Sequence, residues 1–162
     1  MQLADPFQVE RKRIFDLCSS QAQGIVMRCQ ATLRADVRDT NLMWHDIGGQ
    51  IDSLIRDAPT FEAQHHALRL LSEVLNIHPL ALYSLQDFAT RITAEIVRTH
   101  SARTFPNGQY MNLRHWLALA LLDNAYDHEA LLVRIFAESL TDRQTWHAVQ
   151  RLMVVHANGV NV

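Results

Sequence analysis

Four side chains near the end of the chain have types and spacing that could contact nucleic acid. They follow one another at intervals of four, three and one residues, as Arg143, His147, Gln150 and Arg151. Residues three and four apart share one face of an α-helix, and arginine and glutamine pair with the edges of guanine and adenine. The pattern therefore predicts a DNA-binding helix face. The alternative interpretation is a solvated face without a ligand.

A second group of cations brackets residues 99–111 and could contact phosphates: Arg91, Arg98, Arg103 and Arg114. Arginine suits bidentate contacts to phosphate and guanine, and Lys12 is the only lysine of the chain. High-GC codon usage would give the same bias, and arginines dispersed over the surface by chance are the alternative to a patch. The net charge of −2 argues against non-specific nucleic-acid binding through bulk charge.

Patterns that would indicate catalysis or a metal site are missing from the sequence. No His-x-x-x-His or His-Glu-x-x-His spacing occurs, and Gly48-Gly49 lacks the Lys and Ser/Thr of a phosphate-binding loop. No set of nucleophile, base and orienting group is recognisable. We therefore expect no enzyme activity, no metal and no cofactor.

The cellular setting follows from the cysteines and from the apolar runs. Cys18 and Cys29 are eleven residues apart and are expected to be buried thiols in a reducing cytoplasm. The first residues, "MQLADPFQVERKRIF", lack the apolar region of a secretory signal. The apolar runs are too short to span a bilayer. The sequence predicts a cytoplasmic protein without a membrane segment.

Apolar residues recur with the 3.6-residue period of a helix throughout the chain, which predicts an all-α multi-helix bundle. Thr60 and the pair Thr141 and Gln144 are typical of helix starts, and Pro79 fits a first helical turn. Gly48-Gly49 within a helix indicates either close approach of another helix or a break. A minor β-wing near 103–112 is one interpretation of the Pro106-Asn107-Gly108 turn, and a plain loop is the other. The predicted helices are 9–38, 40–56, 60–75, 79–96, about 112–122, 127–138 and 142–155.

Two helix pairs, within 65–92 and 129–153, have the short turn that a helix-turn-helix requires. Many packed helical hairpins share this form, so the pattern alone leaves both interpretations open. We expect residues 1–58 and 60–158 to form an N-terminal helical region and a helix-turn-helix region of one compact domain. The last helix should turn an apolar stripe toward the core, formed by Leu140, Trp146, Val149 and Met153. All three tryptophans should lie in the core: Trp44, Trp116 and Trp146.

Leu80 and Tyr83 are apolar residues on what should be the outer side of the fourth helix. They are expected to contact a partner protein or to form a buried second face. A symmetric reader of DNA gains by binding two half-sites. A homodimer that uses these two residues is therefore predicted.

Three stretches, in this order, resemble the N-terminal helical domain of YhcG-type bacterial nucleases: "WHDIGGQI" (44–51), "LSEVLNIHPLALYSLQDF" (71–88) and the whole of 113–153. The leucine and phenylalanine stripe of that family matches Leu71, Leu75, Leu82, Leu85 and Phe88. The last stretch is also similar to helix-turn-helix segments of ParB-like partition proteins. Where the family has Trp-Ser-His, this chain has Leu113-Arg114-His115 and keeps only the histidine. The matching stretches leave no room for the family's nuclease domain, so the resemblance implies binding or docking rather than cleavage.

The favoured interpretation is a non-catalytic, DNA-binding helix-turn-helix module that acts with a partner protein or as a homodimer. The alternative is a helical interaction subunit of a larger assembly, such as a defence, partition or mobile-element complex, without direct contact to nucleic acid. The low net charge favours the alternative. The order of the matching stretches and the arginine–glutamine face favour DNA binding.

Overall fold

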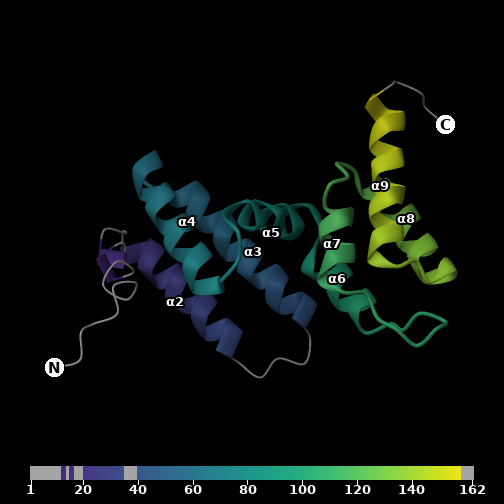
Figure 1. The fold of residues 1–162 in the computed structure, drawn as a ribbon, viewed down its shortest axis with the longest axis horizontal. Coiled ribbons are helices and arrows are strands. Elements are labelled where there is room, and N and C mark those ends of the chain that lie inside the picture. The colour runs from purple at the N-terminus through teal and green to yellow at the C-terminus, as the bar shows by residue number, and fades with distance from the viewer. Residues whose placement is uncertain (1–11, 14, 17–19, 35–39, 158–162) are drawn as a thin grey trace.

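A computed structural model describes residues 12–157 of the chain, except 14, 17–19 and 35–39 (Figure 1). All regular elements in this part are α-helices, which confirms the predicted all-α class. Within the predicted helix 9–38, the described residues 12–13, 15–16 and 20–34 are helical, and the rest of that range lies outside the described residues. The helices are α2 (Ser20–Arg34), α3 (Thr40–Asp57), α4 (Phe61–Leu75), α5 (Pro79–Arg91), α6 (Ala94–Ser101), α7 (Leu113–Leu119), α8 (Ala125–Glu138) and α9 (Asp142–Ala157).

Polar side chains define where the helices begin, and several of these caps were predicted. The Thr60 hydroxyl accepts a hydrogen bond from the Ala63 N–H at 3.1 Å and starts α4. At the start of α9 the Gln144 N–H donates to Thr141 Oγ1 at 3.2 Å, and the Thr141 N–H donates to Gln144 Oε1 at 2.9 Å. This reciprocal pair is a capping box, which satisfies two N–H groups that the helix itself cannot.

The prediction of one helix over 79–96 was wrong, because the helix is interrupted at Ile92 and the segment forms two helices, α5 and α6. Ile92 is extended, with φ −120° and ψ 123°. The Thr93 hydroxyl then accepts from the Ile96 N–H at 3.3 Å and caps α6. A threonine side chain that bonds the backbone two or three residues ahead competes with helix continuation. Apolar residues keep the helical spacing across this interruption, so the sequence pattern does not reveal it.

The predicted β-wing is reduced to one antiparallel bridge between Thr104 and Tyr110. Inside it the Phe105 N–H donates to the Gln109 carbonyl at 2.7 Å, and the Gly108 N–H donates to the Phe105 carbonyl at 2.9 Å. Gly108 has φ +81°, a conformation that glycine adopts without strain. The described residues contain no strand, so the segment is a tight loop.

Helices α3 and α5 approach each other closely at Gly48. A Cβ atom at this position would lie 2.1 Å from the Leu85 carbonyl oxygen and 2.9 Å from the Ala89 Cβ. Only a residue without a side chain fits there. The first of the two interpretations of Gly48-Gly49, close approach by another helix, is thus confirmed, and α3 continues through both glycines without a break.

The buried residues form two clusters that share helices. One cluster joins α2, α3, α4 and the first half of α5, around Ile47, Ile51 and Leu71. The other joins the second half of α5 with α6–α9, around Phe88, Trp116 and Ile135. In Figure 1 α2 and α4 lie at one end of an elongated molecule and α8 and α9 at the other, with α5 between them. None of the helices in the described part of the chain combines the length and apolar character needed to cross a membrane.

Candidate nucleic-acid interface

The turn before α9 is short, and its middle residue is buried. Ser139 ends α8 in the left-handed conformation, with φ 51°, and its N–H donates to the Ile135 carbonyl. The next residue, Leu140, buries its side chain and donates its N–H to the same carbonyl at 3.1 Å. Thr141 then caps α9. Three residues therefore connect α8 to α9, as in the predicted helix-turn-helix pair.

Buried His115 connects this turn to the start of α7. Its Nε2 lies 3.0 Å from the Leu140 carbonyl oxygen, and its Nδ1 lies 3.2 Å from the Asn112 backbone nitrogen. Nδ1 also lies 3.0 Å from Asn112 Oδ1, so both ring nitrogens have polar partners. Through these contacts His115 holds the turn before α9 against the start of α7.

The inner face of α9 is made of small and medium side chains. Thr145, Ala148 and Val149 are buried against α7 and its neighbours, and Leu152 is partly buried. The opposite face carries the four residues singled out by their spacing, and all four are exposed: Arg143, His147, Gln150 and Arg151. The structure thus brings these side chains together on one solvent-facing side of a helix that is anchored at its first turn.

Two apolar residues of α9 are not where the inward stripe placed them. Trp146 is 43% exposed and Met153 is 46% exposed, whereas Leu140 and Val149 of the same predicted stripe are buried. The buried face of α9 begins instead at Thr145, one position before Trp146. Because successive residues of an α-helix are about 100° apart, the indole points about 100° away from the direction of Thr145. Of the three tryptophans expected in the core, Trp116 is fully buried and Trp44 is partly buried. The core assignment of Trp146 was wrong.

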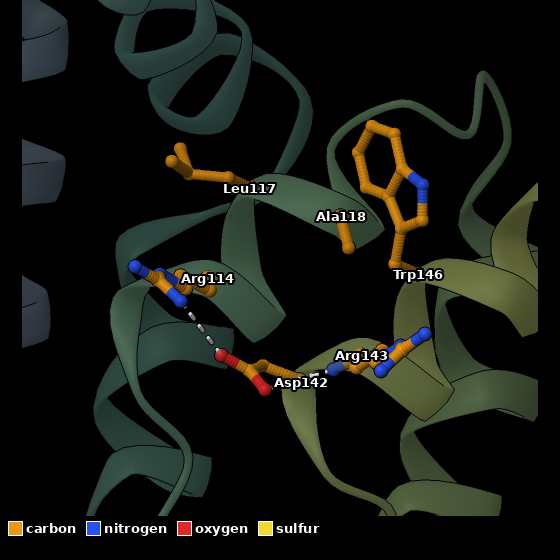
Figure 2. Close-up of a pocket in the computed structure, with 6 residues that line it drawn as sticks. All are labelled: Arg114, Leu117, Ala118, Asp142, Arg143 and Trp146. Atoms are coloured by element: carbon orange, nitrogen blue, oxygen red, sulfur yellow. Dashed lines mark hydrogen bonds and ion pairs between the residues drawn. The ribbon is translucent and has the colours of Figure 1, made fainter.

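The exposed indole forms one wall of an open pocket between α7 and α9, with a volume of about 410 Å³. Figure 2 shows the pocket, with Arg114 and Arg143 pointing away from each other on either side of Asp142. An Asp142 Oδ2 lies 3.7 Å from Arg114 Nη1, and Asp142 Oδ1 accepts from the Arg143 N–H at 2.8 Å. Sequence spacing did not identify this pocket, which is lined by Arg114, Leu117, Ala118, Asp142, Arg143 and Trp146.

The arginines that bracket residues 99–111 lie in different places. Arg114 belongs to the pocket beside α9. Arg91 forms ion pairs with Asp123 at 2.9 Å and Asp87 at 3.6 Å, and it donates to the Ala120 carbonyl. These bonds give Arg91 a structural role at the end of α5. Arg98 is exposed on α6.

Arg103 faces a second groove, between α6 and α8, with a volume of about 720 Å³. Its guanidinium carbon lies 4.2 Å from the centre of the Phe136 ring, and it contacts His100 Nδ1 at 3.2 Å. Burial, and then the charge of Arg103, lower the pKa of His100 below its usual value. Arg91 lines the same groove. Of the bracketing arginines, only Arg114 lies in the pocket beside α9.

The residues expected at a partner contact lie on α5, outside the α7–α9 unit. Leu80 is 69% exposed and Tyr83 is 44% exposed. Both therefore have the exposure that a protein contact requires.

The described residues contain no group of three His, Cys, Asp or Glu side chains placed to hold a metal ion. Comparison of the chain with protein-family models, with curated proteins and with solved structures finds no match in any of the three.

Proposed function

We propose that the protein is a non-catalytic DNA-binding module that contacts nucleic acid through α9. The observation that carries this proposal is the exposed face formed by Arg143, His147, Gln150 and Arg151 on a helix whose base is fixed by a buried turn. In a helix-turn-helix the second helix enters the major groove and its first residues contact the bases. α9 is the second helix of the predicted pair α8 and α9, which supports the proposal.

The distribution of charge supports this part of the chain as the binding region. Residues 1–90 contain eleven Asp and Glu against eight Arg and Lys, so the acidic excess of the chain lies there. Residues 91–157 contain seven Arg against six Asp and Glu. Residues 91–157, which include α9, therefore repel a phosphate backbone less than the net charge of the whole chain would indicate. Modest affinity with strong salt dependence is expected.

The test is a titration of labelled duplex DNA at about 50 mM and about 200 mM salt with the parent, Arg143→Ala and Arg151→Ala. An arginine that contacts a base should lose roughly 1–3 kcal/mol of binding free energy on replacement, with relaxed sequence preference. An arginine that contacts only phosphate should lose affinity equally for all sequences, and the salt slope should fall by about 1.

Arg56→Ala is the matched control, because Arg56 is an exposed arginine of α3 that pairs with Asp52 at 3.2 Å. It removes the same charge from the molecule and should bind DNA like the parent. The proposal fails if the parent binds neither duplex nor single-stranded DNA at the lower salt concentration. It also fails if both α9 variants bind as the control does.

A second candidate function is a helical interaction subunit, favoured by the exposure of Leu80 and Tyr83 in the first turns of α5. Exposed apolar residues that lie close together favour a protein contact. If the partner is a second copy, sedimentation of the parent should show a dimer that Leu80→Glu dissociates. A parent that remains a monomer at high concentration would exclude the homodimer.

A further inference from the structure

Trp146 lies at the surface of α9, whereas smaller side chains of the same helix are buried. The inner face of α9 uses Thr145 and Ala148 instead, and these small side chains let α9 pack on α7. The indole is left 43% exposed and lines the same pocket as the partly buried Leu117. Large aromatic side chains dominate the energetics of interfaces. The position of Trp146 is therefore available to a ligand.

The pocket beside the indole has an apolar floor and a cationic rim. Leu117 and Ala118 of α7 and Trp146 of α9 line it, with Ala118 nearer the indole in the view and Leu117 extending away from it. The guanidinium groups of Arg114 and Arg143 extend in opposite directions (Figure 2). The intervening Asp142 is already engaged, because one carboxylate oxygen is near Arg114 and the other accepts the Arg143 N–H. Two cations and one engaged carboxylate surround an open apolar surface.

This combination suits one unit of a nucleic-acid strand. A nucleobase is flat and stacks on aromatic side chains without regard to its identity. The phosphates on its two sides are anionic and bind arginine. Bases in an intact duplex are already stacked on their neighbours, so only an unpaired or extruded base can reach a side chain in this way.

We propose that the pocket between α7 and α9 binds a single unstacked nucleobase against Trp146, with Arg114 and Arg143 contacting the flanking phosphates. This inference rests on the proposed function, since α9 has to meet nucleic acid for the base to reach the indole. It makes single strands, or duplexes with an unpaired base, better ligands than a fully paired duplex. The ligand class thus differs from that of a helix that only reads a groove.

The test compares three labelled ligands of about 12 nucleotides, a length within the usual site sizes: a single strand, the matched duplex, and that duplex with one unpaired base. The full chain is titrated as the parent and as Trp146→Ala, Trp146→Leu and Trp146→Phe. Trp146→Leu keeps an apolar side chain but no aromatic face, so it separates stacking from apolar contact. Met153→Ala is the matched control, because Met153 is equally exposed on α9 and lies outside this pocket.

The expected result is that the parent prefers the single strand and the bulged duplex. Trp146→Ala and Trp146→Leu should weaken both by roughly tenfold or more, in line with measured base stacking on aromatic residues. They should leave the matched duplex unchanged, while Trp146→Phe and Met153→Ala should behave like the parent. Indole fluorescence should be quenched by the single strand in the parent and not in Trp146→Phe.

Three outcomes overturn the inference. If the two non-aromatic variants bind all three ligands as the parent does, the indole stacks no base. If Trp146→Leu equals the parent while Trp146→Ala is weaker, the contact is apolar and not stacking. In both cases binding that still depends on Arg143 or Arg151 leaves the proposed function standing. If the parent binds none of the three ligands, the proposed function and this inference fail together.

Discussion

Gly48 and Gly49 are neighbours on α3 with different surroundings, and they make a matched pair for mutation. A Cβ on Gly48 would meet the Leu85 carbonyl at 2.1 Å, whereas a Cβ on Gly49 would have nothing within 4 Å. We expect Gly48→Ala to lower the free energy of unfolding by about 1–3 kcal/mol, because α3 and α5 must move apart. Gly49→Ala should raise it by roughly 0.5–1 kcal/mol, because alanine favours the helix.

Urea unfolding followed by circular dichroism measures both changes. Equal effects of the two substitutions would contradict the close approach of α3 and α5. This contact illustrates what single residues reveal in advance. Two glycines in a helix showed that something close was required, but the chain itself does not show which of the two meets the other helix.

Cys29 is expected to be chemically inert in the folded protein. Its side chain is fully buried, and its thiol lies 3.7 Å from Gln50 Oε1. Burial, and then the negative charge of Asp46, raise the pKa of Cys29 to about 12. The thiolate is the reactive form, so at pH values well below this pKa the native thiol should not be labelled.

The experiment uses Cys18→Ser, which leaves Cys29 as the only cysteine of the chain. A disulfide reagent at about pH 8, near the ordinary thiol pKa, should react with it only after denaturant is added. Rapid labelling of the folded variant would show that α2 opens on its own. As the pH rises toward the raised pKa, labelling of the folded form should begin.

Trp146 shows the limit of residue-by-residue prediction. Counting large apolar residues placed it in the core, since tryptophan is usually buried and its spacing from Val149 and Met153 fitted a helix. The inner stripe is instead set by how closely α9 packs on α7, and small residues such as Thr145 and Ala148 allow that approach. Small residues carry little hydrophobic signal, so the rotation of the helix was not visible in the sequence.

At the scale of elements, the start of α9 depends on one hydroxyl group. Thr141→Ala removes the side-chain acceptor for the Gln144 N–H and should cost about 1 kcal/mol of stability. Thr141→Ser keeps the hydroxyl and should be close to the parent. Thermal unfolding of the three proteins measures the difference. A Thr141→Ala protein as stable as the parent would show that this hydroxyl contributes nothing to the stability of α9.

Helix starts could be predicted well because their signals are local. Thr60, Pro79 and Thr141 each act on backbone groups within a few residues, and the structure places a helix start at each. The break after α5 was missed because Thr93 had to be weighed against a continuing apolar period. The pocket beside Trp146 was missed for a different reason. It needs α7 and α9 side by side, and no local pattern specifies that pairing.

For the whole molecule, we expect unfolding in a single transition. Helices α3 and α5 contribute side chains to both buried clusters, so neither cluster can lose its structure without loosening a helix of the other. Ile51→Ala in the first cluster should lower stability by about 2–5 kcal/mol. The loss should be sensed equally in the second cluster. Coincident transitions from different probes are the mark of two-state behaviour.

The reporter for that test is Trp116, kept as the sole tryptophan by Trp44→Phe and Trp146→Phe. Trp116 is fully buried in the second cluster, where its ring stacks on Phe88 at 5.8 Å. Its fluorescence should follow the same urea midpoint as far-ultraviolet circular dichroism, before and after Ile51→Ala. Two separated transitions would show that the two ends of the molecule unfold independently.

The loop tip at 106–109 is exposed throughout and lies between two parts of the second cluster. Phe88, Ile92 and Val97 precede it in the chain, whereas Trp116 and Ile135 follow it. A peptide bond cut at this tip, where nicking is best tolerated, would therefore divide that core between two fragments. Neither fragment could cover its share of apolar surface alone. Each fragment would cover the apolar surface that the other exposes, so a nicked chain would stay together as a non-covalent pair.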